Sequence, residues 1–334
     1  MPSFTTFKGS KDGSIKKSNT TRPDLKNDQV LLRITASGLC GTDEHYRHAD
    51  MALGHEGVGI IESVGPSVKK LKVGDRVGWG YIHDSCGDCA SCNSGRENTC
   101  EERDMYGTAN LDQGSMGSHA IWREHFVFKI PTGVSDKEAA PLMCGGATVF
   151  NALRMYDIQP TERVGVMGVG GLGHLAIQFA SKMGCDVVVF SGTESKKEEA
   201  MKLGANEFVA MKGKTELKLQ KPVDILLVTT SAQPIIDWEL MLPAMAANSK
   251  IFPLTVSSGN LTIPYTPIIM KGIRIQGSVV APRGIQKQMI EFAALHQIKP
   301  ILMEFPMTEE GITTAMKTLG DGKMRYRGVL IPQN

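Results

Sequence analysis

A glycine-rich turn between an apolar strand and an apolar helix constrains the fold of this chain more than any other feature. The run Gly168-Val169-Gly170-Gly171-Leu172-Gly173 fits the pattern G-x-G-x-x-G, follows the apolar residues 164–167 and opens the apolar segment 172–183. In that context the first two glycines let the backbone turn and approach a pyrophosphate, and Gly173 allows close helix packing. The motif therefore predicts a Rossmann dinucleotide-binding domain.

Strand-like and helix-like runs alternate around this motif, whereas the first 145 residues are rich in short β-like runs. The alternation predicts a parallel, doubly wound α/β sheet. At 334 residues the chain is long enough for two domains. We expect an α/β protein with a Rossmann domain at 146–276, a β-rich, partly barrel-like domain formed by 1–145 and 277–334, and an active site in the cleft between them.

The expected elements can be stated by range. Strands are predicted at 30–34, 57–63, 76–78, 126–130, 164–167, 186–190, 225–228, 250–254 and 273–276, and helices at 172–183, 198–203 and 234–246.

Composition excludes several classes of protein. With 41% hydrophobic and 22% charged residues the chain is typical of globular proteins. Its formal charge of +2 gives no field that would attract nucleic acid or an anionic membrane. The segment Met1 to Lys17 has no apolar core, and the most apolar stretch, 164–180, is interrupted by five glycines and His174. We therefore expect a cytoplasmic protein without a membrane-spanning helix.

Four of the seven cysteines lie close together, as Cys86, Cys89, Cys92 and Cys100. This spacing can place four thiolates tetrahedrally around Zn²⁺ at about 2.3 Å. Four protein ligands leave no open coordination position, so the predicted role is structural. Unrelated thiols, a redox sensor and an iron–sulfur cluster remain as alternatives.

A second constellation consists of Cys40, His55 and Cys144, which are far apart in the sequence. Two cysteines and one histidine would leave the fourth position of a zinc ion open for water or substrate, which is typical of a catalytic site. A single Cys or His is more often a packing or surface residue, so only the combination of the three supports a metal site.

These motifs together resemble the zinc-dependent medium-chain alcohol dehydrogenases. Residues 54–68, beginning Gly-His-Glu-Gly, match that family's zinc signature, and the four-cysteine run matches its structural zinc lobe. The segments 141–144, 170–174 and 195–200 look most like the cinnamyl alcohol dehydrogenase branch. The resemblance covers nearly the whole chain and implies a GroES-like catalytic domain beside the Rossmann domain.

The family also implies roles for individual residues. Cys40, His55 and Cys144 would bind a catalytic zinc, with Glu56 either a fourth ligand or a nearby carboxylate that exchanges with substrate, so that each subunit holds two zinc ions, one catalytic and one structural. Thr42 would start a proton relay beside the substrate oxygen, and His45 would pass the proton to solvent. Thr148 would contact the nicotinamide, and Arg327 the pyrophosphate or a subunit interface. A homodimer paired through a strand near 273–280 is expected.

The end of the second Rossmann strand indicates the type of nucleotide. A protein specific for NAD presents Asp or Glu there, but residues 190–193 are Phe-Ser-Gly-Thr. Hydroxyl groups and a positive charge from Ser191, Thr193, Ser195 and Lys196 favour NADP(H) instead. Glu194 is a departure, because members of the cinnamyl alcohol dehydrogenase branch usually have no acidic residue there. Lys196 could also be only a solvated residue at the start of a helix.

The sequence thus predicts an enzyme that transfers hydride between NADPH and the carbonyl carbon of a small aldehyde or its alcohol, with zinc as Lewis acid. Reduction of a C=N or a conjugated C=C bond on the same scaffold is the alternative. A zinc-ribbon module that binds nucleic acid is disfavoured because Cys86 to Cys100 contains Asp88, Arg96 and Glu97 and no basic stripe. An idle scaffold is disfavoured by the complete ligand set. Only 46–53 separate His45 from the Gly-His-Glu motif, which predicts an altered substrate pocket.

Overall fold

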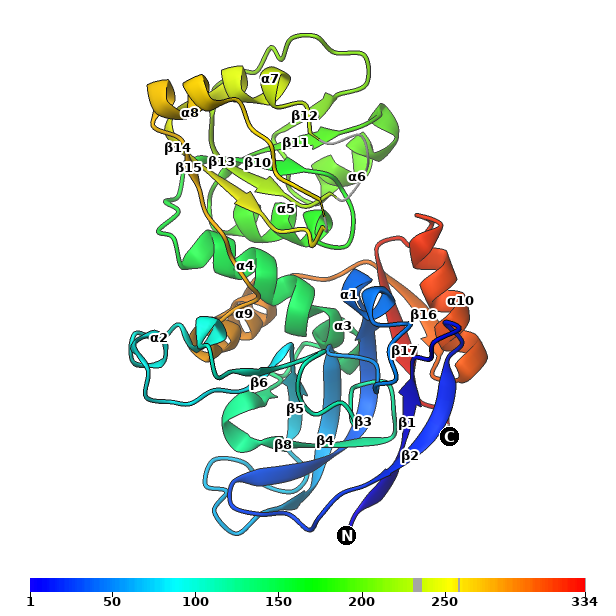
Figure 1. Cartoon of the computed structure of the whole chain (residues 1–334). Coiled ribbons are helices and arrows are strands. Elements are labelled where there is room, and N and C mark those ends of the chain that lie inside the picture. The colour runs from blue at the N-terminus through cyan, green and yellow to red at the C-terminus, as the bar shows by residue number, and fades with distance from the viewer. Residues whose placement is uncertain (231–235, 258, 334) are drawn as a thin grey trace. The chain divides into compact units, whose positions relative to one another are not determined.

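The computed structural model describes residues 1–230, 236–257 and 259–333. The chain forms two compact units, each with its own sheet (Figure 1). Unit 1 consists of Met1–Ala147 and Val280–Asn334, and unit 2 of Thr148–Val279. Unit 1 is therefore built from both ends of the chain. The boundaries expected from the sequence were 145/146 and 276/277.

Unit 1 is organised around β3 (Gln29–Leu39), along which core and surface residues alternate. Val30, Leu32 and Ile34 are buried, which is the two-residue period of a strand with one face on a core. All strand pairs of this sheet are antiparallel except β16 with β17. In the described part of unit 1 the strand order is β16 (Leu302–Pro306), β17 (Arg327–Ile331), β3, β4 (Gly57–Val64), β5 (Arg76–Trp79) and β9 (Phe128–Lys129), with β8 (His119–Arg123) also paired to β3.

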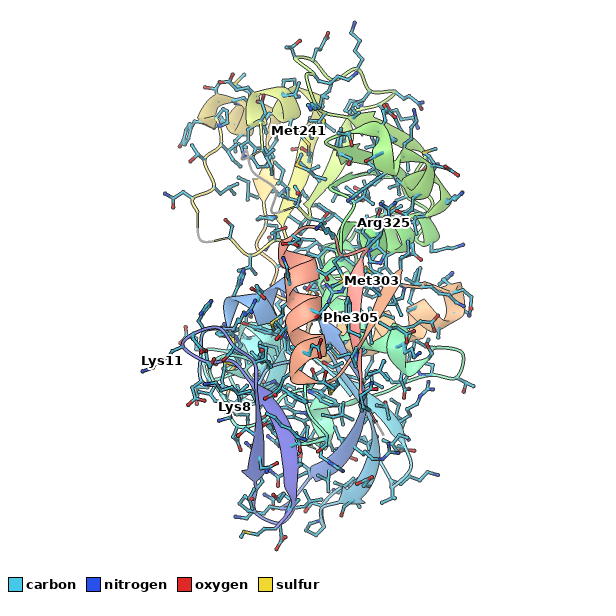
Figure 2. The ribbon with its side chains drawn as sticks, turned by 90° about the vertical axis from the view of Figure 1, so that its right-hand side faces the viewer. Lys8, Lys11, Met241, Met303, Phe305 and Arg325 are labelled. Atoms are coloured by element: carbon cyan, nitrogen blue, oxygen red, sulfur yellow. The ribbon has the colours of Figure 1, made fainter. Side chains whose placement is uncertain are left out.

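The core of unit 1 includes one face of α10 (Glu309–Gly320). Ile312, Ala315 and Met316 of this helix are fully buried in one cluster with apolar side chains of β3, at the helical spacing of three and four residues. Figure 1 shows α10 beside β16 and β17. Met303 and Phe305 of β16, labelled in Figure 2, pack against the same cluster. This packing holds β17 next to β3, at whose end the first predicted metal ligand lies.

The remaining elements complete unit 1. They are the hairpin of β1 (Ser3–Lys8) and β2 (Lys16–Thr21), the pair β6 (Ile82–Asp84) and β7 (Asp104–Met105), the helices α1 (Gly41–His45), α2 (Ala90–Asn93), α3 (Asp136–Pro141) and α9 (Arg283–His296), the 3-10 turns Glu97–Thr99 and Glu124–Phe126, and the π-helix Leu142–Gly146.

Unit 2 is a parallel sheet with the strand order β12, β11, β10, β13, β14, β15 in its described part. Its inner strands are almost continuously buried, as expected when helices cover both faces. The strands are β10 (Arg163–Met167), β11 (Asp186–Ser191), β12 (Glu207–Ala210), β13 (Val223–Val228), β14 (Met245–Pro253) and β15 (Arg274–Ile275). The helices are α4 (Ala147–Arg154, which begins at the last residue of unit 1), α5 (Gly173–Lys182), α6 (Lys197–Lys202), α7 (Trp238–Met241) and α8 (Tyr265–Lys271), with 3-10 turns at Glu194–Lys196 and Leu242–Ala244.

The expected α/β fold, a Rossmann sheet together with a GroES-like β-rich part, is confirmed. The helix expected at 234–246 is confirmed only in part, as the single α-helical turn α7 and the 3-10 turn Leu242–Ala244 that follows it. Residues 234–235 lie outside the described part of the chain, α7 is a single turn, and Met245 already belongs to β14. Pro243 accounts for this, because it has no N–H and its ring clashes with the carbonyl of the preceding turn. Among the described residues, no helix is long and apolar enough to cross a membrane.

Candidate active site

Cys40 lies where β3 ends and the single turn of α1 begins. Its backbone N–H donates to Oδ2 of Asp43 at 2.9 Å, so the carboxylate satisfies the open end of the helix. Asp43 is fully buried. A sharp turn from strand to helix therefore presents the Cys40 thiol and the Asp43 carboxylate to the same interior space.

His55 is fully buried and is oriented by Asp43. Its Nδ1 lies 2.9 Å from Oδ1 of Asp43, and the backbone N–H of Gly54 donates to the same oxygen at 3.2 Å. The other ring nitrogen, Nε2, is buried and has no hydrogen-bond partner among the described residues. A buried nitrogen without a partner is costly unless it binds something, and a histidine held through one nitrogen by a carboxylate is the usual arrangement of a metal ligand.

Cys144 completes the group from the π-helix between α3 and α4. The ligand atoms of Cys40, His55, Glu56 and Cys144 all lie within 4.8 Å of one another. Sulfur, imidazole nitrogen and carboxylate oxygen are the donors that zinc accepts, and the unpartnered Nε2 is among them. The residues present therefore fit a zinc ion. We call these four residues the metal cluster.

Electrostatics within the metal cluster favour the anionic form of one thiol. The contact with Cys144 lowers the pKa of Cys40 well below its usual value, while the pKa of Cys144 is raised. Burial disfavours the charged form of His55, but the adjacent Asp43 carboxylate outweighs it and raises the pKa of His55. At least one of the two thiols is thus poised to lose its proton, which metal binding requires.

Glu56 differs from the other members of the cluster because it already has a charged partner. Nη2 of Arg327 donates to both of its carboxylate oxygens, and the backbone N–H of Gly145 donates to Oε1 at 3.3 Å. Burial raises the pKa of Glu56 to about 7, against the lowering effect of Arg327. The carboxylate is held in the cluster by groups other than a metal.

The four predicted structural ligands also converge. Sγ of Cys86 lies 3.9 Å from that of Cys92 and 3.6 Å from that of Cys100, and the ligand atoms of all four cysteines, Cys89 included, lie within 4.8 Å of one another. Sulfurs arranged tetrahedrally at about 2.3 Å from zinc stand about 3.8 Å apart. Backbone N–H groups, first that of Asp88, lower the pKa of Cys86 to about 7. This four-cysteine lobe therefore also fits zinc.

In unit 2 the glycine motif forms a tight loop between β10 and α5. Gly168 has a φ of +98°, a backbone conformation that residues with a side chain rarely adopt. A Cβ on Gly173 would lie 1.9 Å from the carbonyl oxygen of Gly168, whereas a Cβ on Gly170 would meet no described atom within 4 Å. The loop is thus closed at its ends and open in its middle, which leaves room for a phosphate group at the start of the helix.

The residues predicted to select the nucleotide lie at the end of β11 and in the turn that follows it. Nζ of Lys196 donates to the carbonyl of Val169 at 2.6 Å, and Oγ1 of Thr193 lies 2.9 Å from Oγ of Ser195. Ser191 is the last residue of β11. Glu194 is exposed and pairs with Lys197 at 3.3 Å. Lys196 therefore lies against the glycine loop, and the Thr193 and Ser195 hydroxyl groups lie together just before Lys196 in the chain.

Comparison with known proteins places these features in a family. Residues 26–132 match the alcohol dehydrogenase GroES-like domain, and 171–295 match the zinc-binding dehydrogenase domain. An alcohol dehydrogenase of Geobacillus stearothermophilus is 34% identical over 92% of this chain and 94% of its own. The chain belongs to the zinc-binding medium-chain alcohol dehydrogenases.

Two further relatives refine the position within this alcohol dehydrogenase family. An NADP-dependent alcohol dehydrogenase of Mycolicibacterium smegmatis is 31% identical over 95% of this chain and 94% of its own. The solved structure of a cinnamyl alcohol dehydrogenase of Sorghum bicolor superposes with a TM-score of 0.89 at 27% identity, over 99% of this chain and 98% of that one. Similarity to the cinnamyl branch is therefore confirmed, for sequence and for fold.

The remaining predicted site residues of this dehydrogenase are found in different settings. Oγ1 of Thr42 lies 3.7 Å from Sγ of Cys40, and His45, at the other end of α1, is exposed. Thr148 is buried near the start of α4. Arg327 is also buried and faces Glu56, so its predicted contact with a pyrophosphate stays a prediction.

Three tyrosines form an aromatic wall near His55: Tyr46, the first residue of the short segment 46–53, and Tyr81 and Tyr106 from elsewhere in unit 1. Tyr106 lies 4.6 Å from the His55 ring and Tyr81 lies 5.6 Å from it, measured between ring centroids. Tyr46 packs edge-on against Tyr106 at 5.3 Å. The Tyr106 hydroxyl accepts from the backbone N–H of Gly54 at 3.1 Å. Sequence reasoning missed this wall, because its members are ordinary tyrosines outside any motif.

Proposed function

We propose that this protein is a zinc-dependent, NADP(H)-preferring alcohol dehydrogenase that reduces a small aldehyde to its alcohol. The observation that carries the proposal is the buried metal cluster, in which His55 Nε2 has no partner among the described residues while Asp43 holds the opposite nitrogen. Such a nitrogen, beside two thiols, supports a bound zinc ion with an open position for substrate. A zinc ion held by Cys40, His55 and Cys144 would polarise the carbonyl oxygen and make the carbonyl carbon a better hydride acceptor.

The proton that completes the alcohol is supplied along α1. Thr42 lies beside Cys40 and is half-buried, so its hydroxyl can donate to the substrate oxygen and accept from a second donor. His45 lies in the same turn and is exposed, so it can take protons from solvent and return them through the hydroxyl. Hydride and proton together account for the two hydrogens added to the aldehyde.

NADP(H) is proposed for the nucleotide on three grounds. No carboxylate follows β11 until Glu194, which is exposed and paired with Lys197. Lys196 is held against the glycine loop, where its charge suits a phosphate. A relative of similar length is named as NADP-dependent.

A homodimer is proposed through the outer edge of the unit 2 sheet. β15 is the last strand of the described sheet, and its Ile275 is exposed. Ile269 and Met270 of α8, the helix just before it in the chain, are also exposed, so several apolar side chains of this part of unit 2 face solvent. Light scattering during size-exclusion chromatography measures the molecular mass and tests this.

The proposed activity is tested by following NADPH oxidation against a panel of aliphatic and aromatic aldehydes, with NADH in parallel. Turnover that prefers NADPH, falls on zinc chelation and returns when zinc is restored is the expected result. The variant Cys40→Ser should lose both cluster zinc and turnover. Full turnover in that variant, or reduction only of C=N or conjugated C=C substrates in the wild type, would overturn the proposal.

A further inference from the structure

The four-cysteine lobe is joined to α9 through one buried carboxylate. Glu97, in the 3-10 turn between Cys92 and Cys100, is 4% exposed. Its Oε1 accepts from the backbone N–H of Arg283, the first residue of α9, at 2.6 Å and from Nε of the same residue at 3.0 Å. The residue before α9 is Pro282, whose side chain cannot cap a helix. Glu97 therefore takes the place of the missing cap, where a carboxylate also interacts favourably with the helix dipole.

The orientation of Arg283 is fixed from a second side. Its guanidinium lies 4.9 Å from the centroid of the Phe126 ring, at a distance where a cation is attracted to the aromatic face. The start of α9 is thus held by a residue of the lobe and by a residue of the β-rich core. Movement of the lobe would release one of these two contacts.

One turn further along, α9 reaches the backbone beside Cys144. Gln286 is 4% exposed, and its Nε2 donates to the carbonyl oxygen of Met143 at 3.1 Å. On its other side the Met143 carbonyl oxygen lies so close to Gly80 that a Cβ on that glycine would be 2.4 Å from it. Glu97, Arg283, Gln286 and Met143 also share the lining of a cavity of about 20 Å³, enough for one water.

We infer that the four-cysteine lobe positions the cluster ligand Cys144 through Glu97, the start of α9 and Gln286. Glu97 and Gln286 are positioning residues, since their contacts act on the backbone that carries the ligand. This inference rests on the proposed zinc ion of the metal cluster. Mutation of a residue that orients a metal ligand typically weakens metal affinity by tenfold or more. Weakening either contact should therefore raise the zinc dissociation constant of the cluster by roughly tenfold.

The test compares zinc binding in two variants at opposite ends of this connection. Glu97→Gln keeps the shape of the side chain and removes its charge, and Gln286→Leu removes the donor to Met143 without touching the lobe. Glu101→Gln and Gln288→Leu change exposed residues of the lobe and of α9 and are the matched controls. The amount of zinc per chain is measured by elemental analysis, and zinc affinity by chelator competition. Two zinc-binding phases are expected, and the phase that is absent in Cys40→Ser is assigned to the metal cluster.

The expected result is a cluster phase weakened roughly tenfold in both variants and unchanged in both controls. The lobe phase should be unchanged in Gln286→Leu, which shows that the variant remains folded. Replacing the cluster zinc by Co²⁺ gives a second readout, since its visible absorption reports ligand geometry and should shift in both variants. Unchanged affinity and an unchanged spectrum in either variant would overturn the inference. A wild type that binds only the lobe zinc would overturn the proposed function instead.

Discussion

Arg327 and Glu56 form a buried ion pair beside the metal cluster, although 271 positions separate them in the sequence. One guanidinium nitrogen of Arg327 donates to both carboxylate oxygens of Glu56. Burial raises the pKa of Glu56 to about 7 and Arg327 opposes this, so the charge of the carboxylate depends on its partner. The pair therefore places a carboxylate of adjustable charge within the cluster.

Loss of Arg327 should destabilise unit 1. Arg327→Met leaves the Glu56 carboxylate buried without its cation, and breaking a buried pair from one side costs about 3–5 kcal/mol of unfolding free energy. Adding Glu56→Gln should restore part of this, because no unpaired charge then remains. Denaturant unfolding measures both variants. Arg33→Met, which breaks the more exposed pair with Glu62, is the control and should change the free energy by about 1 kcal/mol or less.

Asp43 should matter for metal binding more than for the shape of α1. Asp43→Asn keeps the size of the side chain but removes the charge that orients His55 Nδ1, so zinc affinity of the cluster should fall about 10- to 100-fold. Chelator competition measures this. Asp50→Asn removes an exposed carboxylate that faces Lys8 at 3.5 Å, and its zinc affinity should match the wild type. Equal zinc affinities in both variants would mean that Asp43 does not support a metal ligand.

Thr42 should act through its hydroxyl group. Thr42→Val keeps the shape and removes the proton donor, so aldehyde reduction should slow by about 100-fold, whereas Thr42→Ser should keep most of the rate. Zinc content must stay at the wild-type level in both variants, because the hydroxyl is expected to serve the substrate and not the metal. If the valine variant reduces aldehyde at the wild-type rate, the proton takes another route.

The parts of the site that sequence reasoning reached are those encoded locally. Cys86 to Cys100 and the glycine run 168–173 each lie within a short continuous segment of the chain, so their spacing alone constrains the geometry. The structure also gathers Cys40, His55 and Cys144, a grouping for which the sequence offers only donor chemistry and family resemblance.

The parts that sequence reasoning missed depend on tertiary packing. The contact of Arg327 with Glu56 follows from the register of β17 against β3, which is set by distant core residues and leaves no local pattern. The contact of Glu97 with Arg283 spans 186 positions for the same reason. The helix expected at 234–246 is confirmed only in part for a different reason, since the apolar period was present and Pro243 interrupted it.

Nucleotide preference should respond to a carboxylate at the end of β11. Ser191→Asp would repel the 2′-phosphate of NADPH and accept from the ribose hydroxyls of NADH, so the ratio of kcat/KM for NADPH over NADH should fall by at least about tenfold. Glu194→Gln removes the exposed acid nearby and should leave the ratio equal or raise it. Steady-state kinetics with both nucleotides measure this ratio. An unchanged ratio in Ser191→Asp would place the ribose away from β11.

The stability of the protein in acid should depend on His83. This side chain is buried and packs on Trp122, with 4.2 Å between the ring centroids. Its Nδ1 has no hydrogen-bond partner among the described residues. Burial lowers the pKa of His83 to about 3, and His55 and Arg22 add repulsion. The unfolded chain binds this proton near pH 6.5, so the stability that neutral His83 contributes is complete above pH 6.5 and is lost as the pH falls toward 3.

At pH 5 that loss amounts to about 2 kcal/mol, because each pH unit between the two pKa values is worth about 1.4 kcal/mol. His83→Phe keeps an aromatic ring on Trp122 and cannot be protonated, so its unfolding free energy should fall about 2 kcal/mol less than that of the wild type between pH 7.5 and 5. Denaturant unfolding at the two pH values measures the difference. His48→Gln, at an exposed position, should follow the wild type. Parallel pH curves for His83→Phe and wild type would mean that His83 takes up its proton in the folded protein as readily as in the unfolded chain.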